Sequence, residues 1–232
     1  FHALVVAIGR ERQPGARHAA QVALLLVDLV RDAVGEDATA VGDRFERAAV
    51  LLAERHRAGC DAHQPRLDDD AFGGLADGAD DDAVPIDPRR AIKELRAAAP
   101  DDTLMITDTG NHQTWVEQYW DVYGPQTVFT PGGFAGMGFG TYGVLGLKLA
   151  RPETPAVCVT SDGSFMMFPG AVATATEYGI PAVWVILNNY TIGVIRDLQR
   201  FYMDGREIGT SFIKQSTGEF WNPDFVQMAE SM

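Results

Sequence analysis

Hydrophobic residues gather in short, almost uninterrupted runs along the second half of the chain. Three runs rich in branched side chains, at 103–107, 157–160 and 182–187, have the length and composition of buried strands. Stretches with apolar residues at helical spacing, or with many small residues, lie between these runs and predict helices at 89–99, 111–119, 140–149 and 171–178. Because strands alternate with helices, we expect an α/β fold with a doubly wound parallel sheet.

The first part of the chain has a different pattern. The apolar run 3–8 predicts a further strand, and 44–57 carries apolar residues at helical spacing. Residues 61–85 are rich in Asp, Gly and Pro and show no periodicity, which is typical of a linker. We therefore expect part of one α/β domain at 1–60, a linker at 61–85 and a second α/β domain at 86–232. The chain begins inside a strand without an initiator Met and stops at Met232 inside the second domain, so we expect both termini to be truncated.

Charge and composition exclude several classes of protein. Lys and Arg number 19 against 32 Asp and Glu, a net charge of −13, and no basic cluster exists that could neutralise phosphates of a nucleic acid. The longest apolar stretch is too short to span a membrane, and the N-terminus lacks the features of a signal peptide. The two cysteines do not indicate a disulfide framework. These features favour a cytoplasmic protein that binds neither nucleic acid nor membranes.

Polar residues follow two of the predicted strands, where ligands bind in parallel sheets. Asp162 lies in a Ser-Asp-Gly-Ser loop, in which Gly163 allows a tight turn whose N–H groups can approach an anion. An acidic group beside such a site requires a cation, and Mg²⁺ binds through carboxylates together with phosphates. Asn189 and the backbone of Thr191, one α/β crossover later, can supply further oxygens. An ordinary Asp-Gly turn and a turn built by Asn188 and Asn189 are the alternatives.

This pair of loops resembles the Gly-Asp-Gly…Asn-Asn signature of the thiamine-diphosphate-binding fold, with Ser161 in place of the first glycine. The resemblance extends over about 86–230 to the diphosphate-binding domain of the acetolactate synthase (acetohydroxyacid synthase) large-subunit family. The run 107–113 is similar to that family's Asp-x-Gly-Gln-His-Gln stretch, and the run 131–140 is similar to its Gly-x-Met-Gly-Phe-Gly loop.

The resemblance implies roles for individual residues. Asn111 and His112 would hydrogen-bond the terminal phosphate, Met137 would hold the cofactor bent, and the Ala135 carbonyl would accept from its aminopyrimidine. As alternatives, His112 is a surface histidine and Met137 fills the core. The metal ligands implied are Asp162, Asn189 and Thr191, and the cofactor-binding residues are Asn111, His112, Ala135, Gly136, Met137, Asp162, Gly163, Ser164, Asn189 and Ile192.

The same resemblance implies an enzyme that uses thiamine diphosphate and Mg²⁺ to decarboxylate a 2-keto acid and join the product to an acceptor. It also implies a homodimer or homotetramer, and it places the activating glutamate on a pyrimidine-binding domain outside this chain, so no catalytic residue is expected here. Residues 1–60 loosely resemble the family's central domain, which raises FAD as a further cofactor.

Other functions stay open at this stage. Leu198 stands where the family typically has Trp, which favours another thiamine-diphosphate decarboxylase or carboligase as the alternative to acetolactate synthesis. Arg196 would pair with a substrate carboxylate or be a charge on the surface of a helix. A non-catalytic relative that only binds the cofactor is a further alternative. A flavin or nicotinamide enzyme is disfavoured because the glycines at 136–140 do not have the Gly-x-Gly-x-x-Gly spacing.

Overall fold

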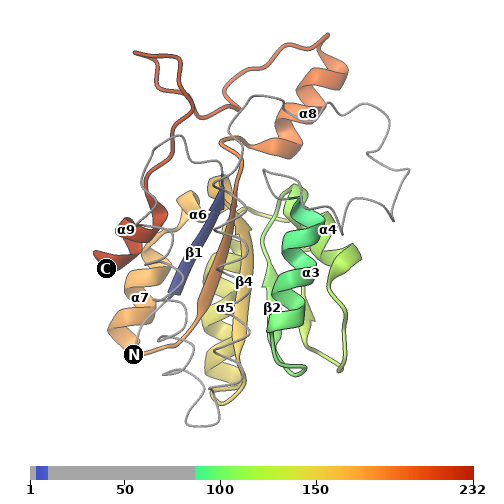
Figure 1. The fold of residues 1–232 in the computed structure, drawn as a ribbon, viewed down its shortest axis with the longest axis vertical. Helices are drawn as coiled ribbons and strands as arrows, with labels where there is room; N and C mark the ends of the chain where they lie inside the picture. The colour runs from blue at the N-terminus through green and yellow to red at the C-terminus, as the bar shows by residue number, and fades with distance from the viewer. Residues whose placement is uncertain (1–3, 10–86) are drawn as a thin grey trace.

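A five-stranded, wholly parallel sheet forms the centre of the described part of the molecule (Figure 1). The computed structural model describes residues 4–9 and 87–232. In sheet order the strands are β1 (Leu4–Gly9), β5 (Val183–Asn188), β4 (Ala156–Ser161), β2 (Leu104–Thr107) and β3 (Val128–Phe129). Because the strands are parallel, all their carboxyl ends lie at one edge of the sheet, the upper edge in Figure 1.

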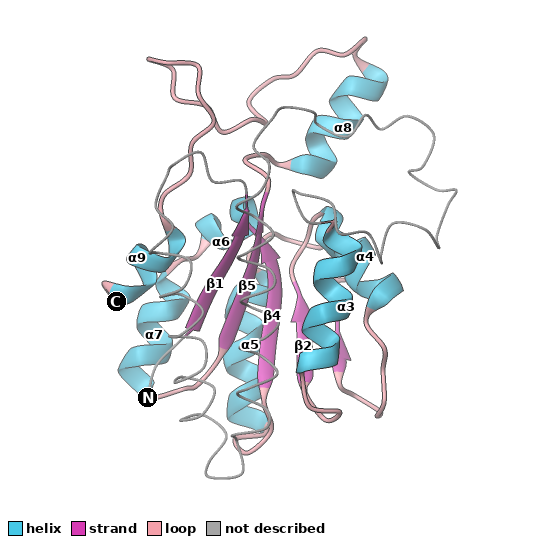
Figure 2. Cartoon of the chain, viewed as in Figure 1, coloured by secondary structure: helices cyan, strands magenta, loops and turns pink. Residues whose placement is uncertain are grey.

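Helices cover both faces of this sheet (Figure 2). Helices α3 (Pro88–Ala98) and α4 (Asn111–Tyr119) pack on one face, and α5 (Phe139–Ala150), α7 (Gly170–Tyr178) and α9 (Phe225–Glu230) pack on the other. Two further helices, α6 (Asp162–Met167) and α8 (Gly193–Tyr202), begin just after β4 and β5. Helix α8 lies beyond the carboxyl edge of the strands. Among the described residues, no helix has both the length and the apolar character needed to cross a bilayer.

The strands supply side chains alternately to two hydrophobic cores, as the pleat of a strand requires. Met105, Val159 and Val185 belong to the core beneath α3 and α4. Their sequence neighbours Cys158 and Trp184 belong to the core beneath α5, α7 and α9. Each fully buried large side chain stabilises the fold by about 1.5–3 kcal/mol through the hydrophobic effect. Strands buried on both faces explain the continuous apolar runs, and the predicted doubly wound parallel sheet is confirmed.

Most of the predicted elements of the second domain are present. The structure confirms the expected strands as β2, β4 and β5 and the expected helices as α3, α4, α5 and α7, with shifts of at most one residue at their ends. One expectation was wrong, because 162–164 is not a loop but the first turn of α6. The short strand β3 and the helices α8 and α9 were not predicted.

Strand β1 confirms the strand expected near 3–8, but its place in the fold differs from the expectation. It pairs in parallel with β5, from Leu4 opposite Val183 to Gly9 opposite Asn188, and so joins the sheet that was assigned to the second domain. The helix expected at 44–57 and the linker at 61–85 lie outside the described residues. The division of the chain at 61–85 therefore stays a prediction.

Candidate functional site

The candidate site lies at the carboxyl edge of β2, β4 and β5, where each strand leads into a helix. Helix α4 begins at Asn111 after Gly110, which has no side chain to cap the helix. The Gly110 carbonyl accepts from the Gln113 N–H at 3.0 Å, and the N–H groups of Asn111 and His112, at the very start of the helix, point away from any carbonyl of an earlier turn. Free N–H groups at a helix N-terminus, together with the helix dipole, favour an anion such as a phosphate.

Close approaches between glycines and neighbouring loops bring the predicted residues together. A Cβ atom placed on Gly193 would lie 2.9 Å from Nδ2 of Asn111 and 3.5 Å from Nδ2 of Asn189. Likewise, a Cβ on Gly163 would lie 3.7 Å from Ile192. The segments that follow β2, β4 and β5 thus converge, although Asn189 itself is exposed.

His112 is buried, with only 2% of its surface exposed, and its Nε2 atom has no hydrogen-bond partner. The alternative interpretation of His112 as a surface histidine is therefore wrong. Burial lowers the pKa of His112 to about 4, although the neighbouring Asp108 acts in the opposite direction, so the ring is neutral at pH 7. In one tautomer Nε2 of a neutral imidazole carries a hydrogen and can donate to an anion. The ring also fixes Gly110, where a Cβ would lie 2.7 Å from it.

Asp162 is the first residue of α6 and is fully buried. One carboxylate oxygen, Oδ2, accepts a hydrogen bond from Asn222 at 2.8 Å, while Oδ1 has no partner. Burial raises the pKa of Asp162 to about 6, against the Asn222 hydrogen bond and the nearby backbone N–H groups, which lower it. A cation at Oδ1 would supply the charge that this buried carboxylate lacks.

The described residues contain no group of three or more His, Cys, Asp or Glu side chains placed to bind a metal. A metal at Asp162 would therefore need neutral oxygens and an external anion as its other ligands. This is the way Mg²⁺ usually binds, through one or two carboxylates together with phosphates and water.

Ser161 has an ordinary extended conformation, with φ −101° and ψ 166°. Its Oγ atom accepts a hydrogen bond from the Ser164 N–H at 3.2 Å and caps α6. Glycine is therefore not required here, and the departure from the Gly-Asp-Gly pattern adds an N-cap. Ser164 also donates from Oγ to the Thr109 carbonyl at 2.8 Å, which joins the start of α6 to the loop after β2.

The loop after β5 has a strained backbone. Tyr190 has φ 59°, which is unusual for a residue other than glycine, and its N–H donates to Oδ1 of Asn188 at 3.2 Å. The Thr191 hydroxyl donates to the Thr210 carbonyl at 2.8 Å, and Thr191 pairs with Ser211 in an isolated bridge. These contacts fix the turn between the predicted ligands Asn189 and Thr191.

The glycine-rich loop before α5 is held by Asp108, at the end of β2. Asp108 is fully buried and accepts hydrogen bonds from the N–H of Gly138 at 2.8 Å and from the N–H and hydroxyl of Thr141 at 3.0 and 2.9 Å. The neighbouring Thr109 hydroxyl donates to the Ala135 carbonyl at 2.8 Å, and Ala135 has φ 48°. The same loop carries Gly136 and Met137, and Met137 is half-buried rather than core filler.

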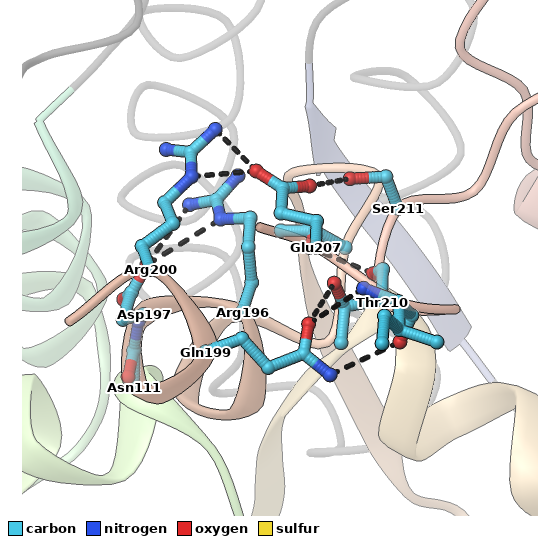
Figure 3. Close-up of polar contacts among 10 residues, drawn as sticks. Asn111, Arg196, Asp197, Gln199, Arg200, Glu207, Thr210 and Ser211 are labelled. Atoms are coloured by element: carbon cyan, nitrogen blue, oxygen red, sulfur yellow. Dashed lines mark hydrogen bonds and ion pairs between the residues drawn. The ribbon is translucent and has the colours of Figure 1, made fainter. Parts of the chain in front are cut away.

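Helix α8 is joined to this site through its polar side (Figure 3). Asp197 accepts a hydrogen bond from Nδ2 of Asn111 at 3.1 Å, and Gln199 and Arg200 contact the segment that follows the helix. Arg196 lies 3.4 Å from the carboxylate of Asp197, as a paired charge on the helix. Leu198, on the apolar side, is 49% exposed.

Two residues of this site were not identified from the sequence. Asp108 belongs to the run that was compared with the family motif, and the signal was a charged residue directly after a buried strand. Asn222 gave no signal, because it lies 60 residues beyond Asp162 in a stretch without periodicity.

The fold and the site together define an α/β domain with a candidate ligand site at the carboxyl edge of its parallel sheet. The comparisons agree with this class. Residues 108–232, more than half of the chain, match the family model described as "Thiamine pyrophosphate enzyme, C-terminal TPP binding domain". The chain belongs to this family. Thiamine pyrophosphate is another name for thiamine diphosphate.

The chain is also similar to several acetolactate synthase large subunits. It is 34% identical over 157 residues to the "Probable acetolactate synthase large subunit" of Methanococcus aeolicus, which covers 66% of this chain and 25% of the relative. It is 34% identical over 146 residues to the "Acetolactate synthase isozyme 3 large subunit" of Escherichia coli strain K12, covering 63% and 24%. The chain thus spans about a quarter of the length of these curated relatives.

A solved structure gives a similar result. The thiamine diphosphate-dependent 4-hydroxybenzoylformate decarboxylase of Rhodococcus jostii RHA1 superposes with a TM-score of 0.58 and 25% sequence identity, over 79% of this chain and 32% of the decarboxylase. The resemblance identified from the motifs is therefore confirmed.

Proposed function

We propose that this chain holds the diphosphate of thiamine diphosphate through Mg²⁺ in an enzyme that decarboxylates a 2-keto acid and joins the product to an acceptor, as an acetolactate synthase does. The proposal rests on one observation. Three buried side-chain polar atoms in the described part of the chain have no hydrogen-bond partner, and two of them are His112 Nε2 and Asp162 Oδ1. They belong to the first turns of α4 and α6, the helices that follow the adjacent strands β2 and β4, where such a ligand would bind.

The chemistry of these atoms fits the two parts of the proposed ligand. Neutral His112 and the N–H groups at the start of α4, with Asn111, donate to the terminal phosphate. Asp162 Oδ1, the Asn189 side chain and the Thr191 backbone carbonyl ligate Mg²⁺, while Gly163, Ser164 and Ile192 line the same place. An unpaired buried donor or acceptor costs about 1–3 kcal/mol, so a ligand that satisfies both atoms gains that free energy.

The glycine-rich loop would contact the other end of the cofactor. Met137 would support its bent conformation, and Gly136 would allow the backbone to come close. The Ala135 carbonyl, which has a second lone pair beside the Thr109 hydrogen bond, would accept from the aminopyrimidine. When bound, thiamine diphosphate supplies the carbanion chemistry that decarboxylation needs. The residues of this chain orient it, and the activating glutamate is expected on a pyrimidine-binding domain outside this chain.

A second function, decarboxylation without carboligation, is favoured by Leu198 and by the decarboxylase among the similar structures. We further propose a homodimer or homotetramer, as the resemblance to the acetolactate synthase large-subunit family implies. A cytoplasmic location and the absence of nucleic-acid and membrane binding stay predictions from charge and composition. FAD also stays a prediction, since the residues proposed to bind it lie largely outside the described part.

Calorimetric titration of the purified protein with thiamine diphosphate tests the proposed site. We expect binding that requires Mg²⁺ and that Asp162→Ala abolishes, while His112→Ala weakens binding in the presence of Mg²⁺ because the phosphate contact is lost. Asp224→Ala, which changes a carboxylate away from the site, serves as the control and should bind normally. Binding without a divalent cation, or unchanged binding to Asp162→Ala, would contradict the proposal.

Product analysis with pyruvate separates the two functions. An acetolactate-synthase-like enzyme releases CO₂ and forms acetolactate, whereas a simple decarboxylase releases the aldehyde. Leu198→Trp tests whether this position directs the acceptor, and we expect a larger share of carboligation product if it does.

A further inference from the structure

Asn222 connects three separate segments next to the proposed metal ligand. It lies between the isolated bridge of Ile213 with Phe220 and the start of α9, and its neighbour Trp221 donates a backbone hydrogen bond to Phe212 at 3.0 Å. From this fixed position its Nδ2 atom donates to Oδ2 of Asp162 at 2.8 Å and to Oδ1 of Asn188 at 2.8 Å. The amide thus bridges the ends of β4 and β5.

We propose that Asn222 is a positioning residue for the cation site. By holding Oδ2 of Asp162, it leaves Oδ1 as the single oxygen that faces the cation. By holding Asn188, whose same oxygen accepts from the Tyr190 N–H, it orients the turn that carries Asn189 and Thr191. This inference rests on the proposed function, because it assumes that Asp162 binds the metal.

The chemistry of an amide suits this role. Both hydrogens of Nδ2 have an acceptor, so the NH₂ group of Asn222 has no donor left over. The amide cannot rotate to bring its oxygen to the cation without losing these two hydrogen bonds. The amide is also neutral. A Lys or Arg at this place would hold Oδ2 equally well, but its charge would repel the metal. Residues that orient a metal ligand typically change metal affinity by about 10- to 100-fold when mutated.

Binding of Mn²⁺, used as the probe in the presence of thiamine diphosphate, tests the role of Asn222. In the purified protein we expect Asn222→Ala to raise the Kd for Mn²⁺ by about 10- to 100-fold. We also expect a changed electron paramagnetic resonance spectrum of the bound ion, because a freed Asp162 can bind through both oxygens. Asn222→Leu, which keeps the length of the side chain but has no donor, should give the same result and provides a second variant if the alanine protein does not fold.

Asp224→Ala is the matched control, because Asp224 lies two residues further along the same segment and caps α9 through the N–H groups of Val226 and Gln227. It loosens the segment without touching Asp162, and we expect the Kd for Mn²⁺ to stay within about twofold of wild type. An equal loss of affinity in Asp224→Ala and Asn222→Ala would show a purely structural role and overturn the inference.

The same titrations separate the inference from the proposed function. If Mn²⁺ does not bind to wild type, or binds equally to Asp162→Ala, the proposed function fails. If Asp162→Ala abolishes binding while both Asn222 variants bind with the wild-type Kd and spectrum, only the positioning role of Asn222 fails.

Discussion

At the scale of residues, a few buried polar side chains at the carboxyl edge of the sheet hold the surrounding loops of the described part in place. Asp108 is the clearest structural case, because each of its oxygens accepts two hydrogen bonds. A carboxylate can accept at both oxygens, whereas an amide presents hydrogens on one side. The charge of Asp108 is thus matched to its donors in the loop before α5.

We therefore predict that Asp108→Asn destabilises the fold although it keeps the shape of the side chain. The NH₂ group of the new asparagine would face the N–H of Gly138 or the N–H and hydroxyl of Thr141. The donors that it faces would lose their acceptor, at a cost of about 1–3 kcal/mol for each unsatisfied group. Urea unfolding measures the change in free energy of unfolding. Asp102→Asn, at an exposed position near the start of β2, is the control and should change stability by no more than about 0.5 kcal/mol. Equal stability of Asp108→Asn and wild type would contradict the prediction.

At the scale of elements, the distance between α5 and β2 is set by a glycine. A Cβ on Gly140 would lie 2.9 Å from the backbone atoms of Thr107 and Asp108, which cannot move without disturbing the sheet. Gly146, in the same helix, has no neighbouring atom within 4 Å of the same position. Helix α5 therefore needs glycine at 140 for packing and does not need it at 146.

Alanine substitutions at these two glycines should have opposite effects on stability. Alanine is favoured over glycine inside a helix by about 0.8–1.0 kcal/mol, so Gly146→Ala should stabilise the protein. In Gly140→Ala the overpacking against the β2 backbone, typically about 1–3 kcal/mol, should exceed that gain and lower the free energy of unfolding. Thermal and urea unfolding of the two variants check the prediction, and a shift of the same sign in both would contradict it.

At the scale of the whole molecule, stability should depend on pH through two buried groups with opposite effects. The pKa of His112 falls from 6.5 to about 4 in the fold, so only the unfolded chain takes up this proton between those values, and stability falls as the pH is lowered. The pKa of Asp162 rises from 3.8 to about 6, so the folded protein takes up the proton first, and stability rises as the pH is lowered through that range. Between about pH 6 and 4 the two effects oppose each other.

Single substitutions should separate these contributions in protein freed of cations by a chelator. Relative to wild type, we expect the free energy of unfolding of His112→Gln to increase as the pH is lowered from 6.5 to 4, and that of Asp162→Asn to decrease between pH 6 and 4. Each slope is at most about 1.4 kcal/mol per pH unit, the value for one proton. Urea unfolding at several pH values measures the differences. Parallel pH profiles for the two variants and wild type would contradict the prediction.

The sequence predicts best those parts of the fold that depend on local pattern. The strands β2, β4 and β5 are buried on both faces and so form continuous apolar runs, and the crossover spacing places Asp162 and Asn189 at the same edge. Strand β3 has only two residues, which is too short for a periodic pattern. The glycine at 163 favours a turn, but the Ser161 cap starts a helix instead.

Helix α8 and Asn222 could not be predicted for other reasons. None of the side chains of α8 is buried within the described fold. Packing against the sheet therefore does not determine the pattern of apolar and polar residues in this helix. The contacts of Asn222 depend on segments 34 and 60 residues away, and no local feature of the sequence encodes them.

The bond between Asn222 and Asp162 has a consequence for the order in which the site is made on the ribosome. Sixty residues separate the two side chains, so at about 5–20 residues per second Asp162 is synthesised about 3–12 s before its partner. Strands β4 and β5 can already have paired in that time, but the carboxylate lacks the amide that orients it. The competent form of the site can therefore appear only after the sheet around it has been synthesised, and a nascent chain that ends before Asn222 exposes an unpaired acidic group to water or to any cation nearby.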